Sequence, residues 1–542
     1  MGARTADLGL NSRAKMIASR VSTSPVSAGV GFGFLERTYG LDLRSLSLFR
    51  IGLGALILGD LIWRAQDLRA FYTDFGVLPR AVLLREWGDR WVILSVHLLS
   101  GTALVQGMLF LLAMGFGVMV LVGYRTNLAT IASWVLLISL QNRTPIILTN
   151  GDLLLRMLLF WAMFLPLNSH FSLDRTLDTR GAEIPQRVFT IGSVSLMAQI
   201  AFVYGFGVIL KSGPEWRTDA SAVYYALSLE QFATPVGRFL LQFPCLLRSL
   251  TVLTLAIETL APILLFCPFM AGPVRTASIF LMMALQVGLL ISMHLGHFPL
   301  VAVVTVIGLL PTWVWSQGLG RSVWWPIARM LHRTPMRMFT DRVYEWMGTH
   351  RSLLARLTRP LRRRPLELRT HWVAGALAAF FLCYVFWWNL GTVSPPLAMP
   401  DPYRWIGEAT RTQQRWNMFA PSPLRDDGWF VMPGVLRNGK QVDVFRDGAP
   451  VSFAKPSAGA IAAQYKNARW RKYLMSLYLA VDSDYPIYYG RYLCRKWNEG
   501  RAANDPARLD TLEIYFMMRT NVSWTQTPKA YEKHLLHSDD CR

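Results

Sequence analysis

Charged residues are scarce in this chain. Only 17% of its 542 residues are Asp, Glu, Lys or Arg, whereas 52% are hydrophobic. Long uncharged runs account for the excess, and ordinary soluble domains do not carry such runs. The composition therefore excludes a typical soluble protein and predicts a chain whose main partner is a lipid bilayer.

Cysteine is also rare, with five residues and no CxxC pair, so zinc-finger spacing is missing. The formal net charge is +22, yet no basic helix is interleaved with aromatic residues. Nucleic acid is therefore not an expected partner. The chain also lacks a Ser-His-Asp spacing, a phosphate loop and a dinucleotide-binding fingerprint. These absences exclude the commonest soluble enzyme classes.

The cysteines fall into two groups. Cys245, Cys267 and Cys383 lie in or beside apolar runs and are interpreted as packing residues. Cys494 and Cys541 lie in the polar C-terminal region. They are hypothesised to form a disulfide if that region is extracytoplasmic.

The apolar runs predict a mainly α fold, a polytopic membrane helix bundle of about eight or nine spans. Most of the runs have the ~20 residues that a bilayer core requires, and the fourth and eighth are short. The stretch 65–101 is expected to hold an interfacial or re-entrant helix. The nine predicted spans are 43–63, 102–123, 127–147, 152–168, 188–210, 249–268, 275–293, 299–316 and 372–391.

The distribution of arginine predicts the orientation. The loop 321–370 carries twelve arginines, and the N-terminus is basic, so both should face the cytoplasm. Eight predicted spans separate them, an even number that agrees with this assignment. The ninth span then carries the C-terminal region outside. The predicted domains are a tail at 1–40, a membrane domain at 41–320, a cytoplasmic loop at 321–371, a final span at 372–391 and an outer domain at 392–542.

The C-terminal region has the pattern of a small α+β domain. Residues 435–444 predict a hairpin, because Asn438-Gly439 supplies the positive φ angles of a tight turn. Residues 512–518 alternate roughly as a strand, and 469–479 is expected to be helical. No internal repeat or low-complexity tract is evident.

Lys211 is the candidate catalytic base. It directly follows the apolar run 188–210. A lysine at a membrane boundary commonly only extends its amine to the interface. A desolvated lysine, however, loses its proton more readily, because burial disfavours the charged form. Both interpretations stay open from the residues alone.

Other polar residues in or beside the spans have structural and functional interpretations. Arg50 and Asp60, in the first span, are expected to pair with partners on other helices. Glu258 could stay neutral by burial, tie helices together or line a cavity. His294 and His297 would share one face if helical, but without a third ligand they predict no metal site. The segment 150–152 either caps the fourth span or contacts substrate.

Several ordered motifs together resemble a known family. They are Leu46–Gly52, Phe71–Arg80, Tyr204–Lys211 with Trp216, Asp219–Tyr225, Gln414–Pro423, Asp427–Trp429 and Asn467–Lys472. In this order they resemble the bacterial horizontally transferred transmembrane domain proteins, which are relatives of vitamin K-dependent γ-glutamyl carboxylase. The resemblance covers about residues 40–535. It implies a bacterial inner-membrane protein whose active site faces outside.

The resemblance implies a chemistry and a pocket. Lys211 matches the lysine that deprotonates a reduced quinone, which would be vitamin K hydroquinone or a menaquinol-like molecule. O2 then oxidises the quinol, and the carboxylase couples this epoxidation to CO2 addition on glutamate. The expected substrate is an exported peptide or protein. The residues expected around Lys211 are Tyr204, Trp216, Asn150, Asp152, His294, His297, Glu258 and Arg50.

One departure weakens the expectation of carboxylation. The carboxylase has a histidine linked to CO2 handling where this chain has Gly151. The leading hypothesis is therefore quinol-dependent base chemistry, in which His294 or His297 could replace the missing imidazole. The alternative is a non-catalytic maturation or export factor for a secreted peptide or protein. A transporter ranks third, because paired broken helices and inverted repeats are not evident.

Overall fold

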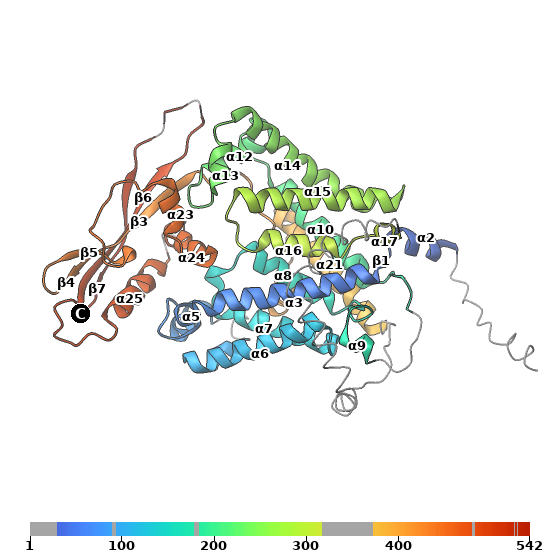
Figure 1. Ribbon diagram of the computed structural model, residues 1–542, viewed down its shortest axis with the longest axis horizontal. Helices are drawn as coiled ribbons and strands as arrows, with labels where there is room; N and C mark the ends of the chain where they lie inside the picture. Colours follow the sequence, from blue (N-terminus) through green and yellow to red (C-terminus); the bar gives the residue numbers. More distant parts are fainter. Residues whose placement is uncertain are drawn as a thin grey trace, which may run out of the picture.

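The computed structural model describes residues 30–88, 94–177, 184–316, 372–479, 483–524, 526–527 and 529–542. It is mainly helical, with a small sheet near the C-terminus. In Figure 1 the long helices run roughly side by side, and the sheet and helices of the C-terminal region cover one end of the bundle. The predicted basic loop 321–371 and most of the tail 1–40 lie outside the described residues.

Six described helices are long and apolar enough to cross a membrane, which indicates an integral membrane protein. Each coincides with one of the predicted spans. They are α3 (Leu43–Ala65), α6 (Ala103–Val122), α10 (Ile191–Leu210), α14 (Pro244–Leu265), α15 (Ala271–Ser292) and α21 (Trp372–Val393).

The other three predicted spans form shorter helices: α7 (Thr126–Arg143), α8 (Asn150–Ala162) and α16 (Phe298–Ile307). The predicted bounds were too long because buried turns and loops beside these helices are also apolar. All residues from Leu154 to Ala162 in α8 are buried. A helix that is apolar on all sides is typical of a bundle core as well as of a lipid-facing span.

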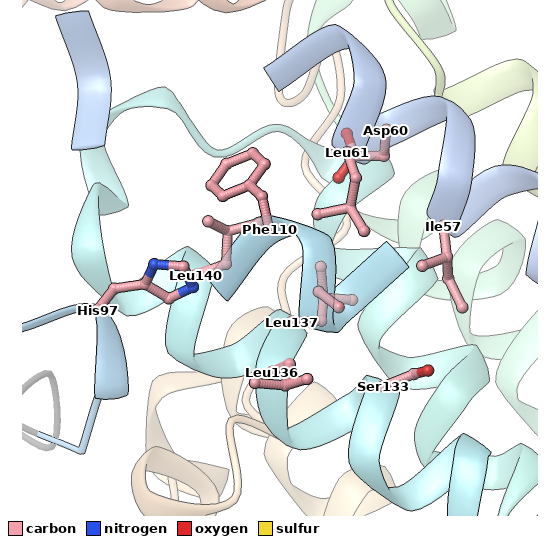
Figure 2. A pocket seen from close by; sticks show the side chains of 10 residues that line it. Ile57, Asp60, Leu61, His97, Phe110, Ser133, Leu136, Leu137 and Leu140 are labelled. Carbon is pink, nitrogen blue, oxygen red and sulfur yellow. The ribbon is translucent and has the colours of Figure 1, made fainter. Parts of the chain in front are cut away.

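Close helix packing depends on one glycine of α3. A β-carbon at Gly54 would lie 2.5 Å from the Cα of Leu121 in α6. The missing side chain lets the two backbones approach each other, as is common between membrane helices. Next to this contact, α3, α6 and α7 enclose a small apolar cavity of about 10 Å³. Figure 2 shows Asp60 and His97 on opposite sides of it.

The C-terminal region contains an antiparallel sheet of β3 (Asp426–Val431), β4 (Pro433–Leu436), β5 (Gln441–Asp443), β6 (Leu509–Thr520) and β7 (Glu532–Asp540). β6 pairs with β7, β3 and β4, and β4 pairs with β5. The predicted hairpin is confirmed as β4–β5, with Gly439 at φ +79°. The predicted strand lies within β6, and the predicted helix is α24 (Ala468–Leu479).

Helix α25 (Tyr485–Asn498) packs against β6 and β7. Cys494 of α25 and Cys541 form a disulfide. The short elements of the described chain complete the fold. They are α2 (Val30–Tyr39), β1 (Leu41–Asp42), α4 (Leu68–Tyr72), α5 (Arg80–Trp87), η2 (Val96–Leu98), η3 (Pro145–Ile147), α9 (Leu173–Thr176), β2 (Arg187–Val188), α11 (Pro214–Arg217), α12 (Ala222–Ser228), α13 (Pro235–Leu240), α17 (Thr312–Ser316), η5 (Pro395–Leu397), α22 (Asp401–Ala409), η6 (Val444–Arg446) and α23 (Ala458–Ala463).

Candidate functional site

A cluster of buried charges joins the membrane helices to the C-terminal region. Asp60 and Arg64 lie one turn apart near the end of α3, and Asp152 lies in the first turn of α8. Arg64 Nε donates to Asp60 Oδ2 at 2.7 Å, and Arg64 also pairs with Asp152. All three are at most 3% exposed. Buried charges need partners, because removing an unpaired charge from water would cost several kcal/mol of folding free energy.

The second cation of the cluster comes from the C-terminal region. Arg469, in α24, pairs with Asp60 and donates to Asp152 Oδ1 at 3.1 Å. Two carboxylates thus meet two guanidiniums. The expectation that Asp60 has a partner on another helix is met by Arg469, but Arg64 of the same helix contributes too. From the sequence alone, Arg469 is singled out only within the segment Asn467–Lys472 that resembles the family.

Asp152 also caps its own helix. Its Oδ2 accepts the backbone N–H of Thr149 at 2.7 Å, which is the capping box of α8. The capping interpretation of segment 150–152 is therefore correct for Asp152, with Thr149 as the N-cap residue. The same carboxylate takes part in the ionic cluster, so capping and pairing fix its position together.

His294 and His297 lie in the turn between α15 and α16, so they do not share a helical face. His297 Nε2 is 3.7 Å from Asp152 Oδ1. Atoms of Asp60, Asp152 and His297 lie within 4.8 Å of one another, which is close enough for a metal ion. The carboxylates already accept bonds from Arg64 and Arg469, however, and a cation would have to displace guanidiniums.

A cavity of about 520 Å³ opens beside this cluster, between the bundle and α24. It is lined by the two histidines and by cations, and its lining contains no acidic residue. Among the lining residues are Trp63, His294, His297, Lys466, Arg469 and Arg471. The cavity is therefore suited to an acidic or electron-rich ligand that reaches the edge of the membrane.

Lys211 ends α10 and is only 5% exposed. Its amine pairs with Glu258 of α14 and lies 5.0 Å from the centre of the Trp216 ring. Arg217 donates to the carbonyls of Lys211 and Val208, at 2.8 and 2.7 Å, and so satisfies the end of the helix. Lys211 is therefore a buried, paired amine and not a lysine extended into water.

The segment 417–425 packs against the residues that follow Lys211. Trp216 Nε1 donates to the carbonyl of Phe419 at 2.8 Å, and Glu215 pairs with Arg425. Tyr204, about two helical turns before Lys211, is buried and accepts a hydrogen bond from Gln286 at 2.9 Å. Glu258 and Trp216 thus lie beside the Lys211 amine, and Tyr204 lies in the same helix. Their role as a cofactor pocket stays a prediction.

The remaining expected pocket residues lie elsewhere. Asp152, His294 and His297 belong to the ionic cluster and its cavity, and Asn150 lines a different, arginine-rich cavity. Arg50 is ten residues from Asp60, or ~15 Å along α3. It donates to four backbone carbonyls, including that of Val120 at 2.7 Å. The expected partner on another helix is therefore found in α6, but it is a carbonyl and not a carboxylate. Within the described residues, the ion-pair interpretation of Arg50 is wrong, because carbonyls at loop and helix ends satisfy the guanidinium.

The fold and these contacts define a class: a helical integral membrane protein with two buried ionic sites toward the end covered by its C-terminal region. Comparisons with protein-family models, curated proteins and solved structures find no match.

Proposed function

We propose that the protein is a membrane enzyme that uses Lys211 as a base on a quinol-type cofactor. The observation that carries this proposal is the buried pair of Lys211 and Glu258. The pair lies where α10 leaves the bundle and is covered by Trp216. A base that acts on a lipid-soluble substrate needs such a position, which is shielded from water but lies at the membrane boundary.

Glu258 gives the amine a hydrogen-bond acceptor. The carboxylate holds the Lys211 amine in place at the end of α10. As a general base, that amine would take the proton of an acidic hydroxyl. A bound quinol would supply that hydroxyl and, with O2 as oxidant, the redox chemistry. Trp216 and Tyr204 would border its ring, since both flank the pair.

His297 is proposed to supply the imidazole that the family resemblance expects at position 151. A β-carbon on Gly151 would lie 2.9 Å from His297 Nε2, so the ring fills space next to that position. CO2 addition to an exported peptide is the further step that this imidazole would serve. We include oxidation of the quinol in the proposal and treat carboxylation as an outcome of the test.

The proposed topology follows from charge and from the position of the C-terminal region. Arg469 contacts Asp60 and Asp152, so this region covers the end of the bundle where α3 finishes and α8 begins. We propose nine membrane segments, with α7, α8 and α16 as the shorter ones inside the bundle. The arginine-rich loop 321–371 then faces the cytoplasm, and the ionic sites face outside a bacterial inner membrane.

The test is quinol oxidation by the purified protein in lipid, with a glutamate-rich peptide and labelled CO2. Lys211→Ala and Glu258→Gln should each lower oxidation at least about 100-fold, as expected for loss of general base catalysis. Lys440→Ala, in the exposed β4–β5 turn, is the matched control. Oxidation that depends on Lys211, without labelled CO2 in the peptide, supports a quinol oxidase. Labelled CO2 in the peptide would show that the protein is also a carboxylase. Full activity of folded Lys211→Ala overturns the proposal.

A second function, a non-catalytic maturation factor, is favoured by the basic lining of the cavity at His297. Lys466, Arg469 and Arg471 there could hold an acidic segment of an exported protein. Binding of a glutamate-rich peptide that Lys211→Ala leaves unchanged, in a protein inactive toward quinols, would favour this function.

A further inference from the structure

A separate cavity of about 720 Å³ lies beside the C-terminal end of α21. It is bordered by the start of α8, by α22 and by the segment that follows α22. None of its lining residues lines the cavity at His297. Its apolar wall includes Leu148, Leu153, Trp388 and Met399, and Trp388 lies in the last turns of a lipid-facing helix. Tryptophan there is typical of the membrane–water interface.

The polar wall of this cavity is cationic. Arg156, Arg404, Arg411 and Arg415 line it, and no acidic residue does. Arg404 pairs with Asp401 at 3.2 Å, in an exposed contact. In the described part of the chain, no carboxylate oxygen lies within 4.0 Å of the other three guanidiniums. Within the described residues, Arg156, Arg411 and Arg415 therefore line one cavity without forming an ion pair.

Arg156 is a buried part of the cavity wall, so the cationic wall is more than a group of surface charges. It is 3% exposed, and its guanidinium is held by neutral groups. Nη1 donates to Gln141 Oε1 at 2.7 Å and Nη2 to the carbonyl of Gln413 at 3.3 Å, whereas Nε has no partner. A cation buried among neutral acceptors with a donor left over is costly unless an anion approaches it.

Arg411 adds a second donor to the same wall. Its Nε also lacks a partner, and burial lowers the pKa of the guanidinium. Planar guanidiniums present paired N–H groups that match two oxygens of a phosphate. Arg415, at the rim, is exposed and adds charge that attracts an anion without being needed to hold the fold.

We propose that this cavity binds a phosphate-class oxyanion, held by Arg156, Arg411 and Arg415. Two sources share that chemistry: the headgroup of an anionic phospholipid and a soluble phosphate. The apolar wall at Trp388 and Leu153 favours the lipid, because acyl chains would lie along α21 while the headgroup meets the arginines. The site is independent of the proposed base chemistry at Lys211.

The experiment uses the full-length protein in nanodiscs of phosphatidylcholine containing phosphatidylglycerol. Native mass spectrometry measures which lipid stays bound, and calorimetry measures pyrophosphate binding in detergent. We expect retention of phosphatidylglycerol over phosphatidylcholine. Arg411→Gln and Arg415→Gln should each weaken it about tenfold, the loss of one charge-assisted contact. Arg411→Lys should restore part of the binding. Arg437→Gln, at an exposed arginine of the β4–β5 turn, should change nothing.

The lipid measurement and the pyrophosphate measurement together distinguish a lipid headgroup from a soluble phosphate. Retained anionic lipid that depends on Arg415 supports a headgroup site, whereas pyrophosphate binding with no lipid preference supports the same oxyanion site for a soluble ligand. Arg415 is exposed, so its variant should fold normally. Binding of neither probe, or equal binding by Arg415→Gln and Arg437→Gln, overturns the proposal.

Discussion

The imidazole of His297 lies directly against Gly151. A β-carbon at position 151 would be 2.9 Å from His297 Nε2 and 3.0 Å from the backbone nitrogen of Phe298. These two residues, 146 positions apart in the chain, therefore form one packing unit at the start of α8 and α16. The glycine is required here by space, because its φ is not in the left-handed region.

Gly151→Ala should lower the free energy of unfolding by about 1–3 kcal/mol, because the Phe298 backbone cannot move away as a side chain can. Removing the imidazole as well, in Gly151→Ala/His297→Ala, should recover part of this loss. Thermal unfolding in detergent measures both. Gly205→Ala, where a β-carbon meets nothing within 4 Å, is the control. A Gly151→Ala protein as stable as Gly205→Ala would contradict the packing argument.

Arg469→Gln should destabilise the protein by about 3–5 kcal/mol, because it leaves Asp60 and Asp152 with only Arg64 to balance two buried charges. Adding Asp152→Asn restores the charge balance and should recover stability. The measurement is thermal unfolding together with proteolysis of the C-terminal region.

The control for that prediction is another ion pair between the same two parts of the protein. Arg69 pairs with Glu499, but both side chains are about half exposed. Arg69→Gln should cost less than about 1 kcal/mol, as exposed pairs do. Equal losses in Arg69→Gln and Arg469→Gln would show that burial of the cluster is not what stabilises this interface.

Asp427 should make stability depend on pH. Burial raises the pKa of this carboxyl to about 7, and its Oδ1 has no partner. Because the folded-state pKa lies above the ordinary 3.8, the folded state binds the proton more tightly. Stability is then greatest below about pH 4 and falls as pH rises toward 7.

Asp427→Asn should remove that fall and be more stable than wild type at pH 8, by up to roughly 4 kcal/mol. Unfolding temperatures measured from pH 5 to pH 8 give the dependence of stability on pH for each variant. Asp426→Asn is the control, since Asp426 is half-buried in the same strand and accepts a bond from Thr520 at 2.7 Å. Parallel slopes for wild type and Asp427→Asn would refute the burial effect.

The disulfide between Cys494 and Cys541 closes a loop of 47 residues that contains β6 and β7. Replacing both cysteines with serine should lower the free energy of unfolding by about 2–4 kcal/mol, because the unfolded chain gains conformational entropy without the cross-link. Reductant should lower the unfolding temperature of wild type but not of this variant. Cys245→Ser, at an exposed free cysteine, should behave as wild type. Thiol labelling of Cys494 in the unreduced protein would contradict the bond.

Local patterns were enough to predict much of this fold. Six apolar runs became long helices because ~20 mostly apolar residues suit a bilayer in almost any context. Asn438-Gly439 predicted the β4–β5 turn because turn chemistry is local, although only Gly439 has the expected positive φ. The same reasoning could not separate α8 from a full span, since an apolar helix suits lipid and a bundle core equally.

The sequence by itself determined a mainly helical membrane protein, one hairpin and one strand of its C-terminal sheet, and the unusual polar residues. Only the tertiary structure decided their partners: Glu258 for Lys211, backbone carbonyls for Arg50, and Arg469 for Asp60 and Asp152. The physical reason is that sequence spacing specifies neighbours one helical turn apart, as with Asp60 and Arg64. A buried charge, in contrast, takes whichever counter-charge or carbonyl the packing of distant segments brings within reach.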